Sequence, residues 1–160
     1  MMIFKKSERE TNTHVYFLRG VFSNFQKASF IYKGLSFENT EQAFMWEKAR
    51  HFGDMGSCSL ILSSSTPMEA KGLGRGVKGY VDKEWDKVRY GYMLEVNRQK
   101  YLQNESFLKI LLSTEDKILV ECNGKDRVWS CGYYATDLRS LDETRWCGRN
   151  LLGKVLMELR

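Results

Sequence analysis

The segment from Asn39 to His51 constrains the fold most, because it predicts a helix that carries two charges on its apolar face. At about 100° per residue, Glu41 and Lys48 fall in one stripe with three large apolar side chains, Phe44, Met45 and Phe52. A charge on a core-facing stripe is costly unless it is paired or reaches water. The pair therefore needs a structural or a functional reason.

The position of each charge within this helix limits the explanations for why the pair lies on the apolar face. Asn39 is suited to cap the helix and Gln42 occupies the reciprocal capping position, so Glu41 lies in the first turn, where the helix dipole favours an ionised carboxylate. Lys48 follows two turns later, roughly 10 Å along the axis, which is too far for a direct ion pair. Either both side chains extend to the rim of the core, or they act together on a ligand.

Length and composition favour one domain. The chain has 160 residues, 42% of them hydrophobic, which is enough for a single core without disulfides or metals. We expect residues 1–14 to form a flexible arm and residues 15–160 the domain. With no apolar run near 18 residues and a polar start, we expect a cytoplasmic protein without membrane contact.

Cysteine and histidine usage argues against several kinds of site. The four cysteines match no zinc or redox spacing and only two histidines are present, so we expect reduced thiols, no metal and no cofactor. Acid–base chemistry would then use carboxylates, lysine or tyrosine. The net charge of +5 suits an anionic ligand, but it is too dispersed to establish nucleic-acid binding.

Local patterns predict the elements of an α+β fold, a helix-rich single domain with a small β-sheet. Glycines 72, 74 and 76 are expected to stop the third helix. Strand composition is found at 15–18, 28–32, 35–37 and 118–121, with an extended piece at 128–134. Helices are expected at 39–51, 54–62, from 67 to the glycines, at 82–102, at 107–111 and after a capping Asn150.

For three further segments, the residues alone leave the functional interpretation open. The residues Gly148-Arg149-Asn150 offer backbone donors and a guanidinium suited to a phosphate, or they are an ordinary helix start. Arg75 either reaches an anionic group or is solvated. Asp126 precedes Trp129 and Gly132, which places a carboxylate near an aromatic plane and a flexible backbone.

The order and spacing of several motifs resemble the NADAR domain family, also called YbiA-like, over Val15 to Arg160. The motifs are Phe22-Ser-Asn-Phe25, Thr40-Glu-Gln-Ala-Phe44 leading to Lys48, Gly74-Arg75, Trp85 with Val88, Asp126 with Trp129 and Gly132, and Gly148 to Arg160. Gln42 and Ser130 stand where members commonly have His and Gly. Both departures leave the charged candidates in place.

The resemblance implies an N-glycosidase that breaks a bond between a ribose anomeric carbon and a nitrogen. It implies an ADP-ribose-containing or ribosyl phosphate substrate, first of all ADP-ribose on guanine bases of DNA or RNA. A ribosylaminopyrimidine phosphate of riboflavin synthesis is the alternative. A non-catalytic module that binds ADP-ribose or nucleic acid is a third interpretation, and the oligomeric state stays open.

Carried over by position, the resemblance also implies roles for individual residues. Glu41 and Lys48 would be the catalytic pair, with Asp126 assisting at the sugar. The expected substrate-binding residues are Asn24, Arg75, Trp85, Trp129, Gly132, Arg149 and Asn150. Cleavage of a ribosyl C–N bond develops positive charge on the sugar, which a carboxylate stabilises. Lys48 would protonate the leaving group or form a Schiff base, the latter if burial lowers its pKa.

Overall fold

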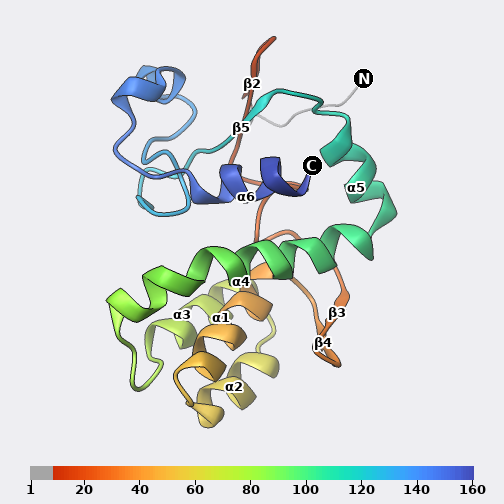
Figure 1. The fold of residues 1–160 in the computed structure, drawn as a ribbon, viewed down its shortest axis with the longest axis vertical. Helices are drawn as coiled ribbons and strands as arrows, with labels where there is room; N and C mark the ends of the chain where they lie inside the picture. Colours follow the sequence, from red (N-terminus) through yellow and green to blue (C-terminus); the bar gives the residue numbers. More distant parts are fainter. Residues whose placement is uncertain (1–8) are drawn as a thin grey trace. The chain divides into compact units, whose positions relative to one another are not determined.

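The computed structural model describes residues 9–160, which form two compact units (Figure 1). The terminal unit consists of residues 9–23 and 106–160, and the central unit is Asn24–Glu105. The chain thus enters the central unit once and returns once. Each unit is described separately below.

The terminal unit is built on a three-stranded sheet in the order β1-β2-β5. Strand β1 (Arg9–Glu10) pairs antiparallel with β2 (His14–Phe17), and β2 pairs parallel with β5 (Ile118–Glu121). A parallel pair needs a long connection, and here that connection includes the whole central unit. The unit also contains most of helix α5 (Glu105–Leu112) and two short 3-10 helices, η1 (Leu138–Leu141) and η2 (Glu143–Arg145).

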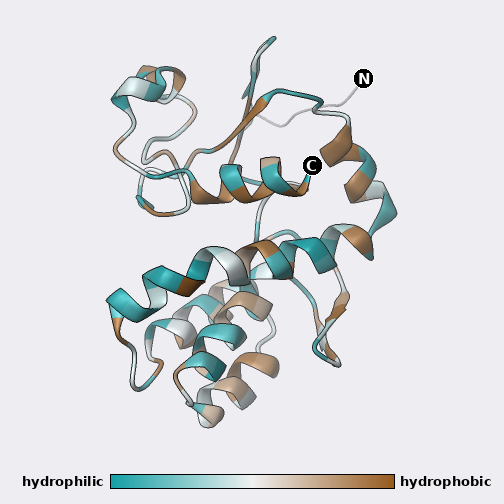
Figure 2. Ribbon diagram, viewed as in Figure 1, coloured by the Kyte–Doolittle hydropathy of each residue, from teal (hydrophilic) through white to brown (hydrophobic). Residues whose placement is uncertain are grey.

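Helix α6 (Leu151–Leu159) packs against β5, and the ribbon of its hydrophobic residues is coloured brown in Figure 2. Gly153 explains how closely the two elements approach. A Cβ atom built at Gly153 would lie 2.0 Å from the carbonyl oxygen of Leu119, so any larger residue would push the helix off the strand. This contact accounts for a glycine inside a helix, where its propensity is poor.

The central unit encloses α1 (Thr40–His51) between other elements. The chain enters it through a hairpin of β3 (Phe30–Tyr32) and β4 (Leu35–Phe37). Lys33 and Gly34 both have positive φ in the two-residue turn, as a type I′ turn requires. Helix α1 then packs against β4 and three helices: α2 (Met55–Leu62), α3 (Pro67–Arg75) and α4 (Asp82–Leu102).

The α+β prediction is confirmed, and the predicted helices and strands lie close to their observed ranges. Three details differ. Of the expected arm 1–14, residues 1–8 lie outside the described residues, while Arg9–Glu10 forms a strand that pairs with β2. The extended piece 128–134 forms no strand. The predicted domain bounds 15–160 stay a prediction, since the division into two compact units does not test them.

The third difference concerns the glycines expected to stop α3. The helix continues through Gly72 and Gly74 and ends at Arg75, so only Gly76 acts as the stop. Gly74 has a packing role instead, because a Cβ at that position would lie 2.0 Å from the Sδ atom of Met45. The glycine allows α3 to approach α1 closely, which a local helix rule does not detect.

Among the described residues, no helix combines the length and the apolar character that a membrane crossing requires.

The two glycines of α3 provide a matched test of this close approach. We expect Gly74→Ala to lower the free energy of unfolding by about 1–3 kcal/mol, since the added methyl group collides with Met45. Gly72→Ala meets no atom within 4 Å and should raise stability by roughly 0.5–1 kcal/mol through helix propensity. Urea unfolding measures both. Equal effects of the two substitutions would contradict the packing role.

Lys100 of α4 gives a pH-dependent prediction. Its side chain is fully buried, and burial lowers its pKa to about 7, whereas an unfolded lysine titrates near ~10.4. Between these pH values the unfolded chain binds one more proton at this residue, so stability should rise with pH by up to ~1.4 kcal/mol per unit. Urea unfolding from pH 6 to 9 should show this rise, and Lys100→Met should remove it. The same slope in both proteins would show that Lys100 does not titrate in this way.

Candidate active site

Helix α1 begins at a point that is firmly attached to the rest of the central unit. The Asn39 side chain accepts a hydrogen bond from the backbone N–H of Gln42 (2.8 Å), which confirms the predicted cap. The Gln42 side chain accepts from the backbone N–H of Glu38 and donates to the carbonyls of Ile61 and Leu62 at the end of α2. Gln42 therefore joins two helix ends rather than closing a capping box.

Glu41 lies in this first turn and is 7% exposed. Its backbone N–H donates to the carbonyl of Asn24 (3.0 Å), so the Phe22–Phe25 segment is tied to the start of the helix through Asn24. The carboxylate is thus held in a largely buried position at the positive end of a helix dipole. This arrangement stabilises a fixed negative charge.

Two groups outside α1 hold the side chain of Lys48. Its Nζ atom donates to the carbonyl of Gly74 (2.9 Å) and lies 4.2 Å from the ring centroid of Tyr80. The Gly74 carbonyl belongs to the last turn of α3, where carbonyls lack partners within the helix. The close approach of α3 to α1 therefore provides the acceptor that positions the amine.

The pKa of Lys48 is lowered, first by burial and second by the positive charge of Arg89. The negative charges of Glu41 and Asp82 act in the opposite direction. Glu41 is therefore within electrostatic reach of the amine, as expected for two groups that share one site. A lowered pKa increases the fraction of neutral, nucleophilic amine near neutral pH.

Aromatic rings pack beside this pair. Trp85 is 3% exposed, and its ring lies 5.2 Å from that of Phe44 and 5.7 Å from that of Tyr92, with His51 and Phe52 also in contact. Trp85 is thus an internal aromatic residue, which suits it to shape a pocket rather than to offer an exposed stacking surface.

Tyr80 and Arg89 were not predicted as site residues, because no local sequence pattern places them next to Lys48.

Two polar atoms near Glu41 have no hydrogen-bond partner within the part of the chain that the structure describes. They are Oδ1 of Asn24 and Oγ1 of Thr40, both in buried residues. Buried polar atoms without partners are rare in folded proteins and often face a ligand. Within the described residues, the other side-chain atom of this amide, Nδ2, donates to Sδ of Met93 at 3.5 Å.

Arg75 is exposed at the end of α3, directly after the glycine whose carbonyl holds Lys48. Its guanidinium makes no hydrogen bond or ion pair with residues 9–160. A guanidinium in this state is available to a phosphate.

A third charge of α1, Glu47, has a structural role that sequence reasoning missed. It is fully buried, and its carboxylate accepts from the Tyr32 hydroxyl (2.5 Å) and lies 2.6 Å from Lys33 Nζ and 2.8 Å from Arg50 Nε. These three partners neutralise it and attach the hairpin to α1. Only Arg50, three residues later in the helix, was a signal in the sequence.

The remaining predicted residues belong to the terminal unit. Oδ1 of Asp126 accepts hydrogen bonds from the backbone N–H groups of Val128 and Trp129, both at 2.8 Å, so the carboxylate shapes the turn that presents Trp129. Gly132 has a φ of 89°, and a Cβ there would lie 2.5 Å from Sγ of Cys147. Arg149 is exposed just before α6.

The expected side-chain cap by Asn150 is wrong. Asn150 precedes α6 but has a left-handed conformation (φ 49°) and makes no capping hydrogen bond. Its Nδ2 atom donates to the carbonyl of Leu119 and its Oδ1 atom accepts from the N–H of Glu121, both at 3.0 Å. The side chain extends the hydrogen-bonding of β5, a tertiary role that no helix-start pattern indicates.

The structure thus assigns the predicted residues to two groups. The central unit contains Asn24, Glu41, Lys48, Arg75 and Trp85, and the terminal unit contains Asp126, Trp129, Gly132, Arg149 and Asn150. Within the central unit, Glu41 and Lys48 share one helix and one electrostatic environment.

Comparison with known proteins places this arrangement in a family. The chain is 39% identical to N-glycosidase R617 of Acanthamoeba polyphaga mimivirus over 122 residues, which cover 76% of this chain and 72% of that protein. It is 34% identical to protein irg-1 of Caenorhabditis elegans over 172 residues, which cover 96% of this chain and 81% of that protein.

A riboflavin biosynthesis protein of Vibrio vulnificus, VVA0006, is 28% identical over 88% of this chain, which corresponds to only 35% of the longer protein. The solved structure of YbiA from E. coli superposes with a TM-score of 0.76 at 28% identity, covering 98% of this chain and 88% of that one. These similarities support a glycosidase enzyme. The family model of the NADAR domain matches residues 5–160, and the chain therefore belongs to the NADAR domain family.

Proposed function

We propose that this N-glycosidase removes ADP-ribose from guanine bases in nucleic acid by cleaving the ribosyl C–N bond. The observation that carries the proposal is the pair on α1: a buried carboxylate, Glu41, and an amine, Lys48, whose pKa burial lowers. An ordinary surface helix has no use for both groups in these positions. A silent binding module would not need an amine prepared in this way.

Glu41 suits the electrostatic part of the reaction. As the bond from the anomeric carbon to the base nitrogen breaks, positive charge develops on the sugar, and a fixed anion in a largely dry site stabilises it. The same carboxylate can accept a proton from the attacking water. The side-chain oxygen of Asn24, whose backbone carbonyl accepts a hydrogen bond from the N–H of Glu41, has no partner within residues 9–160 and would accept a hydrogen bond from a sugar hydroxyl.

Lys48 has two possible roles, and its environment favours one of them. As an acid, it would protonate the departing base nitrogen and would need to be charged. As a nucleophile, the neutral amine would bond to the anomeric carbon as the base leaves with the electron pair of the C–N bond, and the proton lost by the amine would pass to the base. Opening of the sugar ring, with a proton moving from the lysine nitrogen to the ring oxygen, would convert this adduct to a Schiff base, which water hydrolyses to release the sugar and the amine. Burial and Arg89 both favour the neutral amine, so we propose the Schiff-base route.

The substrate is proposed from charge and from the resemblance. The exposed guanidinium of Arg75 suits a phosphate, and the net charge of +5 suits a polyanionic substrate. In the terminal unit, Asp126, Trp129, Gly132 and Arg149 are proposed to contribute to the substrate contacts. A ribosylaminopyrimidine phosphate remains the second candidate, because one relative is named a riboflavin biosynthesis protein.

The first prediction compares two glutamates of the same helix. Glu41→Gln should abolish release of free ADP-ribose from the modified nucleic acid with little change in the urea midpoint, since the carboxylate serves the reaction. Glu47→Gln should lower stability, because it leaves the buried partners of Glu47 unsatisfied. Each protein is incubated in parallel with ADP-ribosylated DNA, ADP-ribosylated RNA and ribosylaminopyrimidine phosphates, and products are identified by mass spectrometry.

Release of free ADP-ribose together with the unmodified strand, and no turnover of the pyrimidine phosphates, supports the proposed substrate. Turnover of the pyrimidine phosphate alone would support the second candidate. Near-normal turnover by Glu41→Gln on any verified substrate would show that the reaction centre lies elsewhere.

The second prediction concerns Lys48. Borohydride added during turnover should trap a covalent sugar adduct on the native protein, and Lys48→Ala should give none. Peptide mapping by mass spectrometry locates the adduct, with Lys100→Met as a control that removes the other lysine of lowered pKa. No adduct on the active native enzyme would leave Lys48 as an acid and contradict the nucleophilic role.

A further inference from the structure

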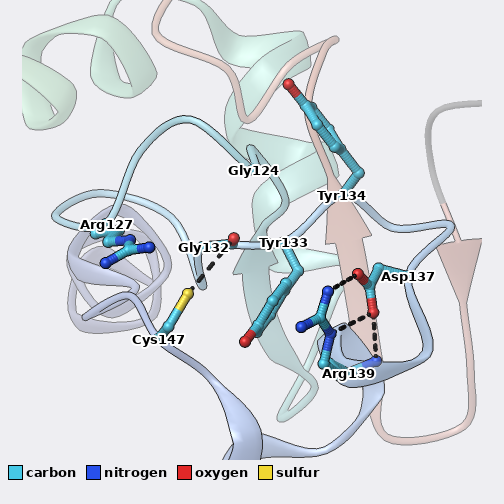
Figure 3. A pocket seen from close by; sticks show the side chains of 8 residues that line it. All are labelled: Gly124, Arg127, Gly132, Tyr133, Tyr134, Asp137, Arg139 and Cys147. Atoms are coloured by element: carbon cyan, nitrogen blue, oxygen red, sulfur yellow. Dashed lines mark hydrogen bonds and ion pairs between the residues drawn. The ribbon is translucent and has the colours of Figure 1, made fainter.

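The terminal unit contains an open pocket of about 400 Å³, and of the residues that line it only Gly132 has a role proposed so far (Figure 3). It is lined by Gly124, Arg127, Gly132, Tyr133, Tyr134, Asp137, Arg139 and Cys147. A pocket of this volume lies in the range that holds a small organic ligand.

The walls of the pocket are firmly built. Backbone hydrogen bonds join the two sides: the N–H of Gly148 donates to Cys131 and the N–H of Arg149 donates to Arg127, both at 2.9 Å. Gly148 allows the two segments to cross, since a Cβ there would lie 2.2 Å from the carbonyl oxygen of Ser130. Tyr133 also packs against the core cluster around Tyr16. The pocket therefore does not depend on a loose loop.

The charges inside the pocket leave one cation available. Arg139 and Asp137 pair through two hydrogen bonds, from Nε (3.0 Å) and from Nη2 (2.7 Å), and this pairing holds the pKa of Asp137 at about 2. Their charges cancel. The guanidinium of Arg127 is exposed and makes no hydrogen bond or ion pair with the described residues 9–160. The pocket thus carries a net positive charge at Arg127.

Two tyrosines supply aromatic surface. The Arg139 guanidinium lies 4.3 Å from the ring centroid of Tyr133, which fixes the orientation of that ring. The Tyr134 ring lies against the backbone of Gly124, because a Cβ at Gly124 would come within 2.7 Å of it, and Tyr134 is 42% exposed. Figure 3 shows both rings extending from one short segment toward different parts of the pocket.

The Arg127 guanidinium and two aromatic rings line the same pocket, and they match the two parts of a nucleotide, an anionic phosphate and a flat base. We propose that this pocket binds one nucleotide unit, with the phosphate at Arg127 and the base against Tyr134 or Tyr133. Its use as a substrate subsite rests on the proposed function. Two sources have this chemistry: the ADP portion of an ADP-ribosyl group, and the nucleotide next to the modified base in the strand.

Binding is measured without turnover, by calorimetry on the full chain carrying Glu41→Gln. The probes are AMP, ADP-ribose, a short unmodified single-stranded oligonucleotide and inorganic phosphate. Arg127→Ala should weaken the binding of AMP about tenfold, since a charge-assisted hydrogen bond is lost. Lys125→Ala removes an equal charge from an exposed residue that does not line the pocket, and should change the Kd less than about twofold. Tyr134→Leu should weaken AMP and leave inorganic phosphate unaffected.

The pattern among the probes identifies the source. Arg127-dependent binding of AMP and ADP-ribose but not of the oligonucleotide assigns the pocket to the ADP portion, and Arg127-dependent binding of the oligonucleotide assigns it to the neighbouring nucleotide. The proposal is overturned if neither AMP nor the oligonucleotide saturates, if Lys125→Ala weakens binding as much as Arg127→Ala, or if inorganic phosphate binds as tightly as AMP. If nucleotides bind as expected while no substrate is cleaved, the proposed function fails and the pocket assignment stands.

Discussion

The hydrogen bond from Lys48 Nζ to the carbonyl of Gly74 is the interaction on which the candidate active site depends. It exists because α3 approaches α1 until the Gly74 backbone touches Met45, a distance that only glycine permits. The contact gives the last turn of α3 a donor and gives the amine a fixed position in a half-buried environment. Gly74 therefore serves both the packing of the two helices and the positioning of the amine. The burial of Lys48 at this contact also lowers its pKa.

Two glutamates of α1, Glu47 and Glu41, have different surroundings although they lie on the same helix. Glu47 is surrounded by Tyr32, Lys33 and Arg50, which satisfy its carboxylate and join the hairpin to the helix. Near Glu41, by contrast, polar atoms of Asn24 and Thr40 have no partner within residues 9–160. We therefore assign Glu47 to folding and propose that Glu41, with these polar groups nearby, serves the reaction.

Local rules predicted much of this architecture. The cap of α1 at Asn39, the helix that begins at residue 67 and the strand at 35–37 all follow from short-range propensities and hydrogen-bonding preferences, and the structure contains each of them. The pairing of Glu41 with Lys48 followed from helical periodicity together with the resemblance to the NADAR family.

What local rules could not predict depends on contacts between distant segments. Tyr80 reaches Lys48 from another part of the chain, and Gly74 is required by a neighbouring helix rather than by its own. Asn150 occupies the position of a cap but uses its amide on β5, since two strand groups compete successfully for it. Such roles arise only when tertiary packing decides which partner a polar group meets.

The proposed reaction depends most directly on the protonation state of the Lys48 amine, which can be measured without any substrate. Reductive methylation with ¹³C-formaldehyde followed by NMR titration reports the pKa of each lysine, and Lys48→Ala identifies the relevant signal. We expect the pKa of Lys48 to lie below the ordinary lysine value of about 10.4 and to rise toward it when Arg89→Met removes the neighbouring positive charge. A Lys48 pKa at or above that ordinary value would contradict the proposed role of the amine.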